Sequence, residues 1–177
     1  KMSVLVIAEH DNKELKSSSL NCLTAAGKLD ADIHLLVAGH QVSSVSEAAK
    51  NVSNVSKVLV ADAEQYGQLT AENIALLVAS IASAYTHILV AATTFGKNML
   101  PRAAALCDMS QISDIISVES ENTFIRPIYA GNALAMVQSS DAIKFITVRA
   151  TAFDATAAVG GNAEVEAINE SNDTKLS

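Results

Sequence analysis

Four short apolar runs, with helical patterns between them, dominate the first half of the chain. The runs are rich in β-branched residues and show no strict alternation, as expected of parallel strands buried on both faces. They span residues 4–8, 33–38, 58–61 and 88–92. Strands and helices that alternate at this spacing imply right-handed crossovers. The sequence therefore predicts an α/β fold with a doubly wound, mostly parallel sheet.

Two helices can be placed between these runs. Thr70 is positioned to cap one of them, and Ser17–Ser19 open an earlier one, for which Gly27 is a candidate terminator. The apolar stripe of the helix after Thr70 follows i, i+3, i+4 spacing, and it consists of Ile74, Leu77, Val78, Ile81, Ala82 and Tyr85.

The pattern changes after Cys107, where strand-like runs follow one another with no room for helices. These runs span residues 112–118, 124–128, 133–137 and 143–148. Asn122 and Gly131-Asn132 supply turn residues between them. The sequence predicts a β-rich C-terminal half, in which a β-meander joins or extends the parallel sheet.

The composition shifts again after Asp154. Gly160-Gly161 introduce a polar segment, and four acidic residues against one lysine then follow, namely Glu164, Glu166, Glu170, Asp173 and Lys175. Such a composition is typical of a linker or frayed end. We expect residues 1–154 to form one domain and residues 155–177 to form an acidic linker or tail.

The charge balance and the cysteines exclude several classes of function. Twelve basic residues against nineteen acidic ones give a net charge of −7, the wrong sign for nucleic acid or an anionic membrane surface. No apolar run approaches the roughly 20 residues that span a bilayer. Cys22 and Cys107 stand alone, so neither a disulfide scaffold nor a zinc site is expected. The N-terminus enters an apolar strand without a signal segment, which favours a cytoplasmic location.

The most suggestive candidate site is the loop over residues 92–98, which leaves a strand and enters a helix, a place where free N–H groups favour an anion. Against the phosphate-loop pattern GxxxxGK[ST], it keeps Gly96 and Lys97 but has Ala91 for the first glycine and Asn98 for the magnesium-binding hydroxyl. We therefore expect no nucleotide hydrolysis. The candidates for a weak anion site are Thr94, Gly96, Lys97 and Asn98. The alternative is a simple helix-initiating turn.

A second loop, Glu9-His10-Asp11-Asn12, also follows a strand. It can be interpreted as an acid–base pair or, more simply, as a solvated turn. The sequence contains no HExxH, GxSxG or GxGxxG pattern. The residues alone predict an α/β module without a catalytic constellation.

Five segments resemble the N-terminal domain of the electron transfer flavoprotein alpha subunit, and they occur in that family's order. They cover nearly the whole chain to about Asp154, and they are VLVIAEH (residues 4–10), ATTFGKNMLPR (92–102), QISDII (111–116), RPIYAGNA (126–133) and ITVR (146–149). The resemblance implies a Rossmann-like, adenine-nucleotide-hydrolase-like fold.

The resemblance also implies a heterodimer of alpha and beta subunits that carries electrons from acyl-CoA and other dehydrogenases, as in fatty acid β-oxidation, to the respiratory chain. In that family FAD lies mainly in the C-terminal domain of alpha, and an AMP lies in beta. FAD is therefore expected in the full-length parent protein and not on this chain, and no cofactor-binding residue is assigned here. The implied location is the bacterial cytoplasm, or the mitochondrial matrix once a transit peptide is removed.

Three classes of function follow. The favoured one is a scaffold and subunit-interaction domain of an electron carrier, not an enzyme. The second is a stand-alone adenine-nucleotide-binding module of the universal-stress type, and the third is an enzyme built on the loop over residues 93–98. We expect the beta subunit to dock on the β-rich half between Ile112 and Val148, where apolar residues exceed the needs of one buried face. An isolated chain can self-associate there. The alternative is a closed meander whose apolar residues all point inward.

Overall fold

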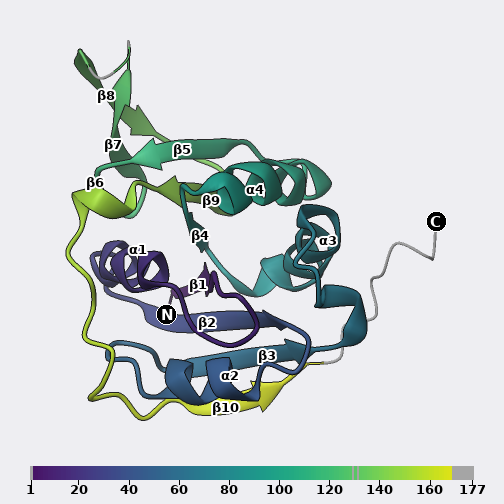
Figure 1. The fold of residues 1–177 in the computed structure, drawn as a ribbon. Coiled ribbons are helices and arrows are strands. Elements are labelled where there is room, and N and C mark those ends of the chain that lie inside the picture. Colours follow the sequence, from purple (N-terminus) through teal and green to yellow (C-terminus); the bar gives the residue numbers. More distant parts are fainter. Residues whose placement is uncertain (1, 129, 131, 169–177) are drawn as a thin grey trace.

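The computed structural model describes residues 2–128, 130 and 132–168, and within these the main sheet has seven strands, all parallel. Their order across the sheet is β10-β3-β2-β1-β4-β9-β5 (Figure 1). The strands are β1 (Ser3–Ile7), β2 (Asp32–Gly39), β3 (Lys57–Asp62), β4 (His87–Ala91), β5 (Gln111–Ile115), β9 (Lys144–Val148) and β10 (Glu164–Ala167). Because the strand order runs in both directions from β1, the sheet is doubly wound, as predicted.

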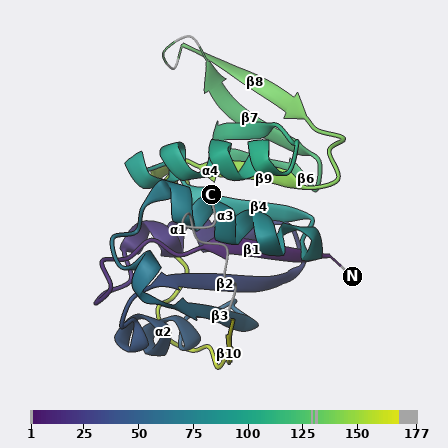
Figure 2. The ribbon, with the colours of Figure 1, turned by 90° about the vertical axis from the view of Figure 1, so that its right-hand side faces the viewer.

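Helices cover both faces of this sheet (Figures 1 and 2). The helices are α1 (Ser17–Gly27), α2 (Ser43–Lys50), α3 (Ala71–Ile81) and α4 (Thr94–Leu106). Side chains of α1 and α2 pack into one core cluster and those of α3 and α4 into another, so the strands lie between two aliphatic layers. All five residues of β4 are buried, which explains why its sequence shows no alternation.

The local signals for helix ends are largely confirmed. The Thr70 hydroxyl accepts a hydrogen bond from the Asn73 amide at 3.4 Å and caps α3. Helix α1 begins at Ser17, and Gly27 is its last residue, followed by Lys28 in a right-handed conformation. The helix therefore ends at Gly27 without the left-handed glycine cap that the residue type suggested.

A second, antiparallel sheet projects from the edge of the domain (Figures 1 and 2). It consists of β6 (Ser117–Ser120), β7 (Thr123–Ile128) and β8 (Ala133–Gln138). The predicted meander is therefore smaller than expected. The run over 112–118 divides at Ile116 between β5 and β6, and the run over 143–148 becomes β9, which lies parallel between β4 and β5. Tyr129 and the predicted turn residue Gly131 lie outside the described residues.

The segment expected to be an acidic linker contributes a strand. The Ala157 carbonyl accepts from the Ser53 amide at 2.9 Å, and the Ala163 amide donates to the Lys50 carbonyl at 2.9 Å. Strand β10 then pairs with β3, and a 3.1 Å ion pair joins Lys57 to Glu166. The division at residue 154 stays a prediction, and Glu170, Asp173 and Lys175 lie outside the described residues.

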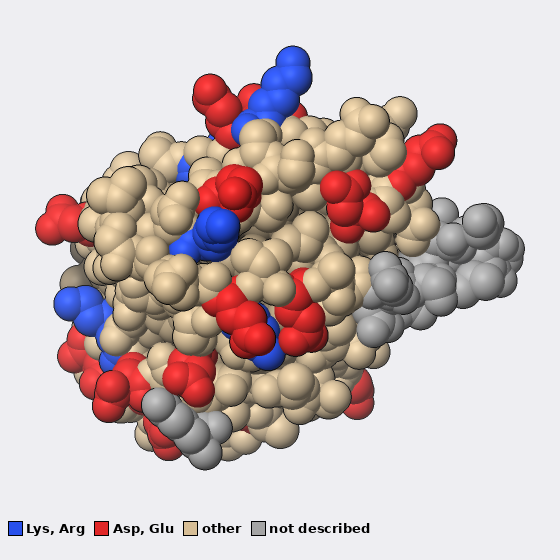
Figure 3. Space-filling view, turned by 90° about the horizontal axis from the view of Figure 1, so that it is seen from below, with Lys and Arg blue, Asp and Glu red and all other residues tan. Residues whose placement is uncertain are grey.

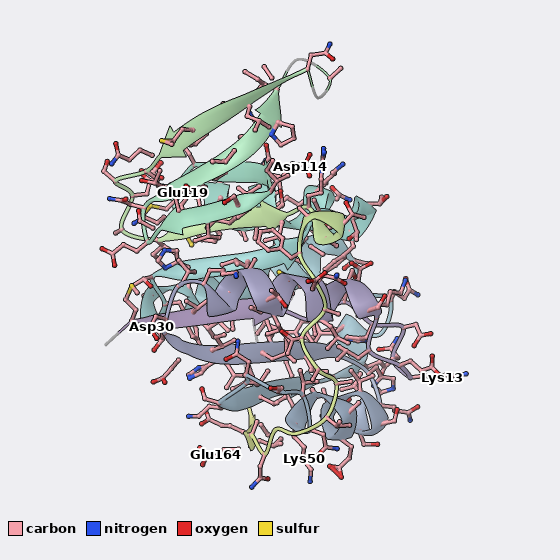
Figure 4. The ribbon with its side chains drawn as sticks, turned by 90° about the vertical axis from the view of Figure 1, so that its left-hand side faces the viewer. Lys13, Asp30, Lys50, Asp114, Glu119 and Glu164 are labelled. Carbon is pink, nitrogen blue, oxygen red and sulfur yellow. The ribbon has the colours of Figure 1, made fainter. Side chains whose placement is uncertain are left out.

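The surface carries acidic and basic side chains interspersed on the side of α2 and β10 (Figure 3). Within the described part of the chain, no helix is both long and apolar enough to cross a membrane. Lys50 and Glu164 lie at one end of the molecule, and Glu119 lies in the opposite half, at the side of the antiparallel sheet (Figure 4).

Candidate functional site

The two loops singled out in the sequence meet at the carboxyl ends of β1 and β4, which are neighbours in the sheet. Thr93 is the N-cap of α4, and its hydroxyl accepts from the Gly96 amide at 3.3 Å. The same hydroxyl donates to Oε1 of Glu9 at 2.6 Å. A negative side chain is therefore tied to the positive end of the α4 dipole.

The four candidate anion-site residues lie on the first turn of α4. Thr94, Lys97 and Asn98 are exposed, whereas Gly96 is buried. A Cβ atom at Gly96 would lie 2.0 Å from the Ala91 carbonyl oxygen. The glycine therefore allows α4 to approach β4 closely, which supports the helix-initiating alternative. The weak anion site stays a prediction.

His10 is a buried structural residue, neither a solvated turn residue nor a free base. It is 3% exposed, its Nδ1 accepts from the Asn12 amide at 2.9 Å, and its Nε2 lies 2.8 Å from the Ala38 carbonyl oxygen. Since Nδ1 accepts, Nε2 carries the proton and donates. Burial lowers the pKa of His10, although the Ala38 carbonyl and the nearby Asp11 and Glu9 oppose the shift.

Asn12 extends this network to the neighbouring loops. Its Nδ2 donates to the Gly67 carbonyl at 2.8 Å, and its Oδ1 accepts from the His40 amide at 3.1 Å. Within the described residues, no group of three or more His, Cys, Asp or Glu side chains is arranged to hold a metal ion. The network holds the loops in place and offers no free general base at His10.

The antiparallel sheet presents an apolar face. The sequence predicted an excess of apolar residues in this half of the chain but not which face of the sheet they occupy. Register pairs Ile125 with Met136 and Pro127 with Leu134, and directly opposite residues point to the same side of a sheet. Leu134 is 62% exposed and Met136 is 69% exposed. We call these four side chains the outer face of the β7–β8 hairpin.

The opposite face of the hairpin is anchored to the domain. Phe124 is fully buried, with its ring in a T-shaped contact with His87 at 6.4 Å between centroids. Arg126 donates through Nε to the Ser113 carbonyl at 2.7 Å. One face of this sheet is thus joined to the core through Phe124, whereas on the other face Leu134 and Met136 are exposed and Ile125 and Pro127 are half-buried.

The apolar residues predicted to supply a docking surface divide into three groups. Ile116 and Ile128 are half-buried, and Leu134 and Met136 are exposed. The remaining described members point into the core and are Ile112, Ile115, Phe124, Phe145 and Ile146. The alternative of a meander whose apolar residues all point inward is therefore wrong for β8, although the residues of β5 and β9 do point inward. Docking of a partner on the exposed residues stays a prediction.

The fold and these surfaces define a doubly wound α/β domain with an exposed apolar hairpin. A family model described as the electron transfer flavoprotein domain matches residues 4–173. The chain belongs to the electron transfer flavoprotein family. This membership confirms the resemblance seen in the sequence.

The curated relatives are alpha subunits of this family. The chain is 56% identical over 168 residues to the electron transfer flavoprotein subunit alpha of Pseudomonas aeruginosa, which covers 95% of this chain and 54% of that protein. It is 47% identical over 176 residues to the same subunit of Bradyrhizobium diazoefficiens, with 99% and 56% covered. It is 45% identical over 174 residues to the mitochondrial subunit of Dictyostelium discoideum, with 94% and 49% covered. The chain spans about half the length of these relatives.

Proposed function

We propose that this chain is the scaffold and subunit-interaction domain of an electron transfer flavoprotein, and that its beta subunit docks on the outer face of the β7–β8 hairpin. The observation that carries the proposal is the exposure of Leu134 and Met136 on a sheet whose other face is joined to the core through Phe124. Covering a side chain of this size stabilises a complex by roughly 1.5–3 kcal/mol. Exposed apolar clusters mark interaction sites in otherwise polar surfaces.

The parent protein, on this proposal, carries electrons from acyl-CoA and other dehydrogenases to the respiratory chain. Its flavin is FAD, held outside the described residues. The α4 N-terminus does not fit the FAD pyrophosphate, because the Glu9 carboxylate is already bonded to the capping hydroxyl of Thr93 there. The 56% identity to a bacterial protein supports a location in the bacterial cytoplasm.

Binding to the beta subunit tests the docking role. The double variant Leu134→Ser/Met136→Ser removes the exposed apolar side chains without touching the core. Size-exclusion chromatography with light scattering and calorimetric titration should show the unmodified chain bound to beta at micromolar concentration, with the double variant at least about tenfold weaker. Any self-association of the isolated chain should be lost in the same variant.

Val165→Ser is the matched control, because Val165 is 46% exposed on β10 at the opposite edge of the main sheet. It should bind beta like the unmodified chain. Equal affinities for the double variant and the control, or an unmodified chain that never co-elutes with beta, would refute docking through the hairpin.

A further inference from the structure

Met136 is the methionine of this chain whose side chain is most open to solvent. The chain has four methionines, and all of them are among the described residues. Met99 is fully buried in α4, and Met2 and Met109 are half-buried, whereas Met136 is 69% exposed on β8. An oxidant in solution reacts with a thioether only where it can reach the sulfur atom. Exposure therefore singles out Met136 as the methionine that an oxidant reaches first.

The packing of the antiparallel sheet keeps the side chain of Met136 on the outside. Half-buried and exposed residues alternate along β8, and Met136 is one of the exposed set. Its neighbour Val137 points the other way and packs against the core. A change of register that buried Met136 would expose Val137. The hairpin also projects from the edge of the domain (Figure 2). The position of Met136 in solvent is thus fixed by the fold.

The two cysteines are weak competitors for an oxidant. A thiol reacts with a peroxide as the thiolate. Cys22 is fully buried, and burial raises the pKa of its thiol. Burial also raises the pKa of the thiol of Cys107, which is half-buried. Both thiols are therefore protonated at neutral pH, and Met136 is the most exposed of the sulfur-containing residues.

Oxidation of Met136 would change the chemistry of the outer face of the β7–β8 hairpin. Met136 lies directly opposite Ile125, and the exposed Leu134 lies two residues away on the same side of β8. A sulfoxide adds a polar oxygen to this apolar group. In the free chain this oxygen stays hydrated, so folding is unaffected. Under a partner that covers the face, the oxygen would lose its water, which is unfavourable unless a new donor replaces it.

We propose that Met136 is a site of reversible oxidation by hydrogen peroxide and related peroxides, and that its oxidation prevents docking of the beta subunit. The sulfur lone pair attacks one peroxide oxygen, the O–O bond breaks and an S–O bond forms. The proton of the attacked oxygen passes to the departing hydroxide, which leaves as water. The sulfur loses two electrons and the peroxide gains them. Two thiols acting through a methionine sulfoxide reductase reverse the change, giving the thioether, a disulfide and water.

The assignment of the oxidation site stands by itself, whereas its effect on docking rests on the proposed function. Peptide mapping by mass spectrometry, after exposure of the chain to millimolar hydrogen peroxide, tests the site. Met136 should gain one oxygen at least about tenfold faster than Met99 or Met109. The melting temperature of the oxidised chain should stay within about 2 °C of that of the untreated chain. Oxidation of any other methionine or of a cysteine ahead of Met136 would overturn the proposal.

Calorimetric titration with the beta subunit, after the peroxide has been removed, tests the effect on docking. The oxidised chain should bind at least about tenfold more weakly than the untreated chain, and treatment with a methionine sulfoxide reductase and a thiol should restore binding. Met136→Leu is the matched control, because leucine is apolar, similar in volume and free of sulfur. This variant should bind beta like the untreated chain both before and after peroxide.

Protection by the partner gives a second measurement. Bound beta should slow the oxidation of Met136 at least about fivefold and leave that of Met109 unchanged. If the untreated chain does not bind beta, the docking function and its regulation are both refuted, and the peptide map still decides the oxidation site. If binding survives oxidation of Met136, or if peroxide weakens binding of the Met136→Leu chain as much, this inference fails and the docking function stands.

Discussion

Glu9 and Thr93 are 84 positions apart in the chain, and the hydroxyl of Thr93 donates to the carboxylate of Glu9 at 2.6 Å. The bond joins the end of β1 to the start of α4 across the centre of the parallel sheet. The same hydroxyl caps the helix. The Thr93 side chain thus both caps α4 and links it to the end of β1. Because it has these two roles, its removal should lower the free energy of unfolding by a measurable amount.

Thr93→Ala should lower the free energy of unfolding by about 1–2 kcal/mol, because it removes both the cap and the partner of Glu9. Thr93→Ser keeps the hydroxyl and should lose less than half of that. Urea denaturation followed by circular dichroism measures both. If the alanine and serine variants unfold at the same urea concentration, the hydroxyl has no such role.

Gly96→Ala should be more harmful than its small size suggests. The added Cβ would lie 2.0 Å from the Ala91 carbonyl, a backbone atom that cannot rotate away. We expect a loss of about 2–3 kcal/mol, measured by the same denaturation. Lys97→Ala, on the exposed side of the same turn, should stay within about 0.5 kcal/mol of the unmodified chain. An anion-binding role for the turn would instead make phosphate stabilise the unmodified chain and not the Lys97 variant.

Mild acid should destabilise the domain. Burial lowers the pKa values of His10, His34 and His87 in the folded state. The unfolded state therefore binds more protons as the pH falls below about 6.5, and stability present above that pH is lost on acidification. Melting temperatures measured from pH 7.5 to 5.0 should fall, and His10→Gln should show a shallower dependence. A melting temperature that is constant over this range would contradict buried, neutral histidines.

Gly161→Ala should release the segment that leads to β10. The Gly161 amide donates to the Asn51 carbonyl at 2.9 Å, and a Cβ there would lie 2.0 Å from the Val52 carbonyl oxygen. Limited proteolysis within residues 155–168 should become several-fold faster than in the unmodified chain. Asn162→Ala, an exposed neighbour, provides the comparison. Equal cleavage rates in the two variants would mean that the segment does not depend on this close contact.

The first half of the fold was predictable because each buried strand corresponds to a separate apolar run in the sequence and each helix shows apolar residues at helical spacing. The later strands were harder. Asp114 has a φ of +61° and lies where the register of β5 against β9 shifts, an irregularity that the apolar pattern of residues 112–118 does not predict. Strand β10 reads Glu-Val-Glu-Ala and is exposed along its length, so its pairing with β3 leaves no hydrophobic signature.

The candidate site shows the same division. Gly96 was noticed for its place in a phosphate-loop pattern, but the contact that requires a glycine is with the Ala91 carbonyl, which only the fold brings near. The bond from Thr93 to Glu9 was missed. Both residues follow buried strands, and the signal available was that such strands can be neighbours in the sheet. Exposure of Leu134 and Met136 depended on which face of the hairpin packs inward, and strand alternation alone does not choose between faces.

The position of β9 has a consequence for how the chain acquires its shape during synthesis. Strand β4 pairs with β1 along one edge, and its other edge stays unpaired until β9, about 50 residues later in the chain, has been synthesised. At roughly 5–20 residues per second, a ribosome leaves that edge open for several seconds. Strand β5 emerges first, yet its place is beyond β9. Native placement of β5 and the hairpin therefore requires that residues 144–148 have been synthesised. We infer that premature pairing of β5 with β4 is the misfolding event to which this topology is prone.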